Sequence, residues 1–444
     1  MSHTEKKHDQ YYEMANAPIS HIIPKLAAPT IVSMLISSIY NMADTFFVSQ
    51  LGTSASGAVG VIFSAMSIIQ ALAFMIGMGS GNYMTRSLGA GKRELAEQIV
   101  SIAFFTGIIM GLVITVSATF NIHRVVLLLG ATETIAPYAE AYAHYIFIAA
   151  PFMICSFIMN NLLRFQGKAS FAMVGITVGG LLNIALDPLF IFTLDMGTAG
   201  AALATGLSQF ISFCILLWMC NHQDSCISIS IRKFRPKLAI YREVLYGGIP
   251  SLGRQGIASV ATILMNFMCQ PYGDAAIAAM IGFGQGFQPV CSYCFGAGLY
   301  DRVKKACWFC IRVSTIILLV LSVISFPAAR SIITLFRRND PTVIEIGTLA
   351  LRLQLITLPL QGAVIMGNMM PQSIGYGFRA TLVSTARQGI FLIPLLTIMT
   401  YTIGLLGIQC AQPLADIATF ILSLFVIRGI FKEFPEDASS FAAQ

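Results

Sequence analysis

Two aspartates, Asp44 and Asp187, lie in stretches of this sequence that are otherwise apolar. A charged side chain in the middle of a bilayer costs at least about 2.5–3.5 kcal/mol on insertion scales, so such residues usually face a protected cavity on an ion or substrate pathway. Asn183 precedes Asp187 by four residues, which places both side chains on one face of a helix. Thr205 and Asn160, in neighbouring apolar stretches, offer further hydroxyl and amide oxygens. Oxygens of these types, shielded from water, can share protons or bind a hard monovalent cation such as Na+.

The same five side chains also have structural interpretations. An aspartate can be paired internally and serve only packing, and amides and hydroxyls commonly form hydrogen bonds between membrane helices. The cost of burying a carboxylate favours ion binding for Asp44 and Asp187. Both interpretations stay open for Asn183, Asn160 and Thr205.

Three more residues in apolar stretches are candidates for a role in transport. Pro29 lies in the first stretch, where a proline removes one backbone hydrogen bond and allows a helix to kink, so it is a candidate hinge. Arg254 and Arg387 occur in similar Arg-Gln-Gly triplets. They are candidates for a substrate cavity, but they can also pair with Asp416 or extend to the membrane surface.

The composition is that of an integral membrane protein. Of the 444 residues, 56% are hydrophobic and only 11% are charged, with a mean hydropathy of +0.76. These are too few polar side chains to cover a soluble globule of this size. A spanning helix needs about 20 mostly apolar residues, and we count twelve such runs separated by short polar loops. The predicted fold is an all-α polytopic membrane protein with about twelve transmembrane helices, embedded in a lipid bilayer.

The net charge of +7 does not indicate a nucleic-acid partner, because the basic residues gather in alternate loops. They include Lys92, Arg164 and the cluster at 232–237, whereas the loops at 50–56 and 196–200 are almost uncharged. An excess of Lys and Arg marks cytoplasmic loops. We therefore expect a multi-pass protein of the bacterial plasma membrane with both termini in the cytoplasm. The polar N-terminal stretch has no separate apolar segment with a cleavage site, so we expect no cleaved signal peptide.

An internal repeat divides the sequence into two halves of six helices. Aligning Pro29 with Pro250 superimposes turns and glycines of the two halves, and the longest polar loop falls at the midpoint. We predict an N-terminal lobe at 1–221 and a C-terminal lobe at 222–444. Repeats of this kind build transporters whose substrate site lies between the two halves.

The repeat comparison also exposes a difference between the halves. The eighth helix, predicted at 274–294, has about 14 fewer residues than its counterpart, and the shortfall lies between Met280 and Ile281. A helix of this length barely crosses a hydrocarbon core of about 30 Å. The activity of the chain therefore depends on whether this segment still spans the membrane.

Motifs for enzymatic or cofactor chemistry are absent from the sequence. There is no Gly-x4-Gly-Lys-Ser/Thr element for ATP, the glycine-rich segments follow no strand, and no catalytic triad or His-Glu-x-x-His pattern occurs. Two Cys-x2-Cys pairs, at 291–294 and 307–310, have a spacing compatible with zinc. They lie in apolar helices without a histidine, so we interpret them as small apolar filler. We expect neither an enzyme nor a cofactor.

Several stretches together resemble the multidrug and toxic compound extrusion (MATE) family of secondary transporters, most closely its bacterial branch of small multidrug exporters. The resemblance extends over residues 20–430 and is carried by NMADTFFV at 41–48, GSG at 79–81, LGAGK at 88–92, NIALDP at 183–188 and GQGFQP at 284–289. It implies two six-helix lobes arranged as a V around a central cavity, with exchange of drug for H+ or Na+.

The resemblance also implies roles for individual residues. The family's first-lobe cation site maps onto Asp44, Asn183, Asp187 and Thr205, with Asn160 close by. The acidic second-lobe site of another branch has no glutamate here around Met265.

The predicted function is efflux of cationic amphiphilic compounds by antiport with H+ or Na+, carried out by a monomer through alternating access. One alternative is a flippase for a lipid-linked saccharide or another lipid, which favours a strongly basic cavity. A remoter alternative is an intramembrane enzyme.

Overall fold

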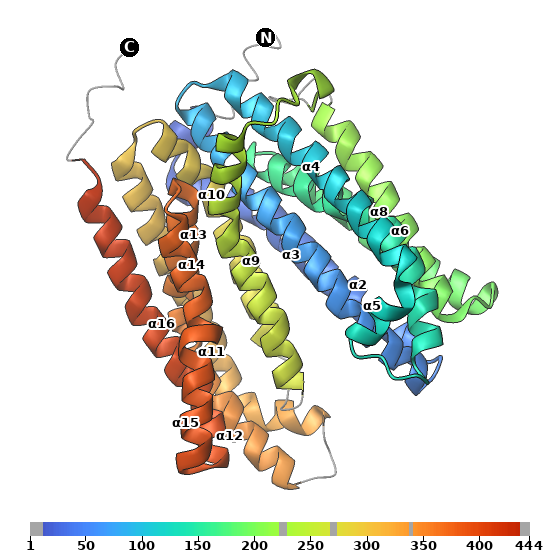
Figure 1. Cartoon of the computed structure of the whole chain (residues 1–444). Coiled ribbons are helices and arrows are strands. Elements are labelled where there is room, and N and C mark those ends of the chain that lie inside the picture. The colour runs from blue at the N-terminus through green and yellow to red at the C-terminus, as the bar shows by residue number, and fades with distance from the viewer. Residues whose placement is uncertain (1–11, 222–228, 267–272, 337–340, 436–444) are drawn as a thin grey trace.

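A computed structural model describes residues 12–221, 229–266, 273–336 and 341–435. In this part of the chain the regular structure is helical, with no strand. Figure 1 shows two helical bundles that lie together at one end of the molecule and diverge toward the other, which gives the chain the shape of a V. The predicted fold class, two six-helix lobes forming a V, is confirmed.

The first lobe follows from long apolar runs interrupted by glycine turns. Its helices are α2 (Ile19–Ser49), α3 (Thr53–Gly89), α4 (Arg93–Phe120), the short α5 (Ile122–Leu128), α6 (Ala136–Phe165), α7 (Ala169–Pro188) with the π-helical turn η1 (Leu189–Thr193), and α8 (Gly197–Asn221). Gly91 and Gly167, at the turns after α3 and α6, have φ values of 74° and 80°, which favour glycine because it lacks a Cβ.

The second lobe repeats this plan with more breaks in its helices. It consists of η2 (Ile231–Lys233), α9 (Leu238–Asn266), α10 (Gly273–Gly296), α11 (Tyr300–Phe336), α12 (Pro341–Thr357), η3 (Leu358–Leu360), α13 (Gln361–Ile374), α14 (Gly377–Thr385), the π-helical η4 (Ala386–Leu392), α15 (Ile393–Ile403) and α16 (Leu405–Glu433). Across the described residues, ten helical segments are long and apolar enough to cross a membrane. The predicted boundary between the lobes, at 221 and 222, adjoins a segment outside the described residues.

The expected shortening of the eighth helix is present. The α10 helix has 24 residues, whereas its counterpart α3 has 37. At a rise of about 1.5 Å per residue, 24 residues still extend about 36 Å, which exceeds a hydrocarbon core of about 30 Å. The helix is therefore long enough to span a bilayer.

Matching contacts show the repeat directly. The side-chain amide of Asn160 in α6 donates to the carbonyl of Ala172 in α7 at 3.0 Å, and that of Asn368 in α13 donates to the carbonyl of Ala380 in α14 at 2.8 Å. Both pairs are twelve residues apart. These two contacts give a common reference point for comparing the lobes residue by residue.

Two helices connect the lobes at the narrow end of the V. The first half of α2, from Ile22 to Ala27, belongs to the apolar core of the second lobe, and its later residues Ile36 and Tyr40 contact α7 of the first lobe. The α9 helix mirrors this arrangement, because its first half packs in the core of the first lobe. Pro29 lies where α2 passes from one lobe to the other.

Glycines allow the helices of the two lobes to cross closely at this end. A Cβ atom built on Gly79 of α3 would lie 2.0 Å from the carbonyl oxygen of Val244 in α9, and one on Gly248 of α9 would lie 2.1 Å from that of Met75. The backbones therefore touch at distances that no larger residue permits. The narrow end is a close-packed joint.

Candidate cation site in the first lobe

Three side chains on α7 and α8 form a buried hydrogen-bonded group. The amide nitrogen of Asn183 donates to Asp187 Oδ1 at 3.3 Å and to Thr205 Oγ1 at 3.2 Å. All three residues are buried, and Asp187 has no exposed surface. The four-residue spacing in α7 aligns Asn183 with Asp187, and the packing of α8 on α7 adds Thr205. The structure therefore brings together three of the predicted cation-site residues.

The site contains more oxygen acceptors than donors. In the described part of the chain, Asp187 Oδ2, Asn183 Oδ1 and Asp44 Oδ1 are buried and have no hydrogen-bond partner. A buried acceptor without a partner costs about 1–3 kcal/mol, and more when it is charged. A proton or a monovalent cation bound at these oxygens would remove that cost. The donor set, two carboxylates with amide and hydroxyl oxygens, fits H+ or a hard monovalent cation.

A small cavity adjoins this group. Its lining includes Asn183 and Thr205, the ring of Tyr40 from α2, Gly179 on α7 and Gln209 on α8. The cavity volume is about 20 Å³, roughly the space that one water-sized group needs. A dehydrated ion or a water fits here, whereas a drug-sized molecule needs a pocket of at least about 300 Å³.

Sequence reasoning did not identify two aromatic residues of this site. The hydroxyl of Tyr142 in α6 is buried and hydrogen-bonded to Thr205, and Tyr40 lines the cavity one turn before Asp44. Tyr40 precedes Asp44 by four residues, so the sequence alone places both side chains on one face of the helix. Nothing in the sequence near Tyr142 distinguishes it from other tyrosines in apolar stretches.

The structure assigns a contact to Asn160 that does not involve the carboxylates. Its amide nitrogen is used for the bond to the Ala172 carbonyl, and in the described residues no hydrogen bond joins it to Asp44 or Asp187. This contact holds α6 against α7 at Ala172, about three helical turns before Asn183. A direct role of Asn160 in cation binding stays a prediction.

Pro29 and Arg254 lie outside this site. Pro29 is in the interior of α2, and its carbonyl accepts the hydroxyl of Ser33 at 2.9 Å. Arg254, in α9, donates from Nη1 to Oδ1 of Asn368 at 2.9 Å. The structure therefore places Arg254 beside the repeat contact of the second lobe. The described residues that line the first-lobe cavity come from α2, α6, α7 and α8 and not from α9.

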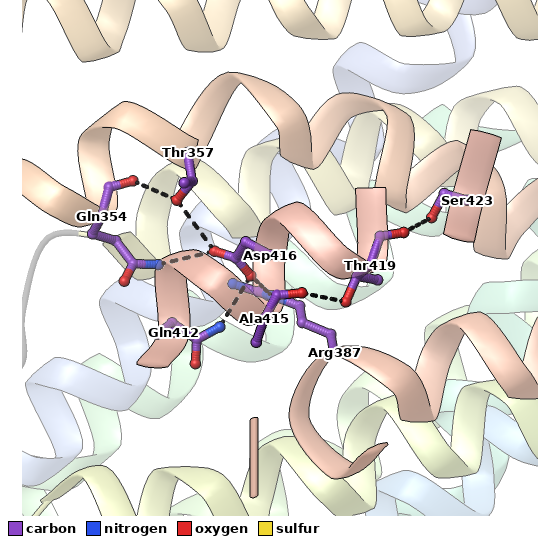
Figure 2. Close-up of polar contacts among 8 residues, drawn as sticks. All are labelled: Gln354, Thr357, Arg387, Gln412, Ala415, Asp416, Thr419 and Ser423. Atoms are coloured by element: carbon purple, nitrogen blue, oxygen red, sulfur yellow. Dashed lines mark hydrogen bonds and ion pairs between the residues drawn. The ribbon is translucent and has the colours of Figure 1, made fainter. Parts of the chain in front are cut away.

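Arg387 is part of a separate polar network in the second lobe, shown in Figure 2. Its Nε donates to Oδ1 of Asp416 at 2.8 Å, the pairing that the sequence offered as an alternative to a place in a substrate cavity or at the membrane surface. The same carboxylate accepts Gln412 Nε2 at 3.0 Å, Gln354 Nε2 at 3.4 Å and the hydroxyl of Thr357 at 3.5 Å. Asp416 is thus buried with four donors, from α12, η4 and α16.

The described residues contain no group of three or more His, Cys, Asp or Glu side chains that could hold a metal ion. The four cysteines with zinc-like spacing are buried together in the apolar core of the second lobe.

Comparison with known proteins gives the family. The MatE family model matches residues 29–189 and 250–398, so its two matches begin at the aligned prolines Pro29 and Pro250. The chain belongs to the MatE family. A relative from Staphylococcus saprophyticus, "Multidrug export protein MepA", is 26% identical over 436 residues, which cover 95% of this chain and 96% of that protein. The protein of the same name from Staphylococcus haemolyticus is 25% identical and covers 98% of this chain and 99% of its own length.

Solved transporter structures have the same architecture. One is described as the outward-facing conformation of a multidrug resistance MATE family transporter; it superimposes with a TM-score of 0.88 at 25% identity and covers 95% of this chain and 98% of its own. Another, from Pyrococcus furiosus, has a TM-score of 0.86 at 25% identity over 96% of this chain and 98% of its own. Its description states that a reverse polarity of the binding pocket suggests a different function.

Proposed function

We propose that this MatE protein exports cationic amphiphilic compounds by antiport with H+ or Na+. The observation that carries the proposal is the group of buried oxygens without donors around Asp187 and Asp44, next to a cavity of the size of one ion. Full-length similarity to proteins named for multidrug export supports the class of cargo.

The contrast between the two lobes supports coupling in the first lobe. Asp416 accepts four donors, one of them from a guanidinium, so its charge is already compensated. Asp187 accepts one amide at 3.3 Å, and Asp44 Oδ1 accepts none in the described residues. A carboxylate with free acceptor capacity gains most from an added proton or cation. Asp44 and Asp187 are therefore the residues to which we assign coupling.

The cargo needs a different place, because the ion-sized cavity excludes it. We infer that drugs bind between the two lobes, which diverge toward the wide end of the V (Figure 1). Alternating access then requires the joint at the narrow end to open while the wide end closes. A ligand shifts this equilibrium only by as much as its affinities for the two states differ, so drug and cation must favour different states.

The hinge for this motion is assigned to Pro29. The segment of α2 before it packs in the second lobe, and the segment after it contacts α7, which carries Asn183 and Asp187. A bend at the proline would move one segment relative to the other, because the N–H that would hold the helix straight is missing. The cation site and the connection between the lobes are thus parts of one helix pair.

The orientation follows from charge. Helix α2 begins at the narrow end of the molecule, and helix α16 ends there (Figure 1). The basic residues Lys92 and Arg164 lie at or just after the C-terminal ends of α3 and α6, at the same end of the molecule. By the positive-inside rule this end faces the cytoplasm of the bacterial cell. The protein would then open its wide end to the outside.

Purified protein in liposomes tests the proposal. Ethidium efflux is measured under an imposed pH gradient or an imposed sodium gradient, for the wild type and for Asp44→Asn and Asp187→Asn. One of the gradients should drive efflux in the wild type, and both variants should lose it. Asp195→Asn is the matched control, since Asp195 is exposed with a φ of 52° that asparagine also adopts. Efflux at wild-type rates in Asp187→Asn contradicts the proposal.

One observation favours a second function, transport of a lipid with an anionic head group. Arg164 is buried at the narrow end and contacts the amide oxygens of Gln285 and Asn161. Arg254 also has an amide partner, and neither arginine pairs with a carboxylate in the described chain. Two basic groups of this kind can attract an anion. Translocation of a fluorescent anionic lipid in the same liposomes, without any gradient, would support this alternative over drug export.

A further inference from the structure

The second lobe contains a polar group at the position of the first-lobe cavity. Ala172 and Ala380 accept the equivalent hydrogen bonds of the two lobes. Gly179 in α7 lies seven residues after Ala172, and Arg387 in η4 lies seven residues after Ala380. The helices α7 and α14 with η4 therefore carry a glycine and an arginine at matching places. Gly179 lines the cavity of the first lobe.

A second pair of matching positions lies on the last helix of each lobe, α8 and α16. Gly197 and Gly404 have φ values of 56° and 64° at the start of α8 and α16. Twelve residues after these glycines lie Gln209, which also lines the cavity, and Asp416. Two of the positions that border the first-lobe cavity are thus occupied in the second lobe by the two members of an ion pair.

Side-chain size gives these two matching places different contents. Gly179 contributes no side chain, and a Cβ placed on it would already lie 3.0 Å from Cβ of Ser212. Arg387 instead extends a long side chain from η4 to α16, where its guanidinium reaches Asp416. The side chain of Arg387 is 20% exposed and that of Asp416 is fully buried. At the place where the first lobe has a glycine and a small cavity, the second lobe thus has a guanidinium paired with a carboxylate.

The chemistry of the filled site matches that of the open one. Thr205 in the first lobe is eight residues after Gly197, and Gln412, which donates to Asp416, is eight residues after Gly404. Each site therefore has a buried carboxylate with amide or hydroxyl neighbours. They differ in that the second site already contains a positive charge, covalently attached to the chain.

We propose that Arg387 is a built-in cation, which occupies in the second lobe the place that the coupling cation takes in the first. This inference rests on the proposed function for the identity of the first-lobe ligand. Its consequence is that Asp416 takes no ion from solution while Arg387 is in place. Arg387 then determines that one lobe of this protein couples to H+ or Na+, and removing it exposes a second cation site.

The experiment uses a parent protein in which the first lobe can no longer bind a cation, Asp44→Asn/Asp187→Asn. Three variants are made in this parent: Arg387→Met, Arg387→Lys and Arg387→Met/Asp416→Asn. Binding of radioactive sodium to purified protein is measured at about pH 8, where protons compete least, and thermal stability is compared between about pH 8 and about pH 5. A ligand that binds only the folded state raises the unfolding temperature.

Arg387→Met should gain a response, either sodium bound at one ion per chain or an unfolding temperature that rises as the pH falls relative to the parent. Arg387→Lys keeps a cation beside Asp416 and should not respond. Arg387→Met/Asp416→Asn lacks the carboxylate and should also not respond. A folded Arg387→Met variant that behaves like the parent overturns the proposal, as does a response that persists without Asp416.

A second measurement keeps the inference testable if Arg387→Met does not fold. Asp416→Asn in the otherwise native protein should retain the full sodium or proton response of the wild type, because the second lobe contributes none of it. Loss of that response would contradict the built-in cation. Failure of the proposed function appears separately, as a parent Asp44→Asn/Asp187→Asn that responds to sodium and pH like the wild type.

Discussion

The substitution of aspartate by asparagine should have opposite effects on stability in the two lobes. Asp187 has one weak donor and a second oxygen without a partner, so Asp187→Asn removes a charge that the fold does not compensate. Asp416 has four donors, including Arg387, so Asp416→Asn leaves a guanidinium in a buried place without its counter-charge. The same substitution thus removes an uncompensated buried charge in the first lobe and leaves one in the second lobe.

Magnitudes follow from the burial of each group. Breaking a buried ion pair by removing one partner costs about 3–5 kcal/mol, and the 20% exposure of the Arg387 side chain places the effect of Asp416→Asn near the lower end. For Asp187→Asn we expect no loss and a gain of up to about 1–3 kcal/mol, the cost of one unsatisfied buried acceptor. Stability and activity should therefore diverge, as they do at many functional sites.

The assay measures thermal unfolding of the two variants and the wild type in one detergent at neutral pH, and ethidium efflux in liposomes with equal amounts of folded protein. Asp187→Asn should unfold at or above the wild-type temperature without efflux. Asp416→Asn should unfold at a lower temperature and keep efflux per folded molecule. Unfolding temperatures that move in the same direction for both variants would refute the assignment of a compensated and an uncompensated carboxylate.

Three further predictions concern the hinge, the joint and the cation site. Pro29→Ala should raise the unfolding temperature and slow efflux, because alanine is favoured over proline by about 3 kcal/mol in a helix interior and restores the missing hydrogen bond; stability that falls would argue against a strained hinge. Gly79→Ala should lower the unfolding temperature, since its Cβ would lie 2.0 Å from the Val244 carbonyl, whereas Gly60→Ala on the same helix meets no atom within 4 Å and should be harmless. Thr205→Val removes the hydroxyl that accepts the Asn183 amide and should raise the cation concentration for half-maximal efflux about fivefold, for a bond of about 1 kcal/mol, while Thr205→Ser should not.

Much of the architecture could be predicted from the sequence, because the constraints of a bilayer are strong. Every backbone polar group must be satisfied within the helix, so apolar runs of sufficient length specify spanning helices. The alignment of Pro29 with Pro250 likewise anticipated the repeat that Asn160 and Asn368 show in atomic contacts. The exchange of the first halves of α2 and α9 between the lobes was not predictable, since apolar faces look alike whichever bundle buries them.

The candidate site was predictable where helix geometry fixes it. The four-residue spacing of Asn183 and Asp187 determines a shared face in any helix, and their contact is present. Thr205 needed the resemblance to a known family, because nothing in a single sequence states which face of α8 meets α7. The Arg387–Asp416 pair was one of two options for that arginine, since a long side chain can reach either a partner or the membrane surface.

The two lobes differ in how the charge of their buried carboxylates is compensated. The sequence named Asp416 and Arg387 as a possible pair in the second half but did not relate them to the first-lobe site. The structure shows that the carboxylate lies on α16, the last helix of the second lobe, and that the arginine compensates it. A duplicated fold has thus conserved the location of a polar site but not the residues that build it. One site has a vacant acceptor that an ion can satisfy, and the other is satisfied by the chain itself, so a nearly symmetric scaffold supports coupling that is one-sided.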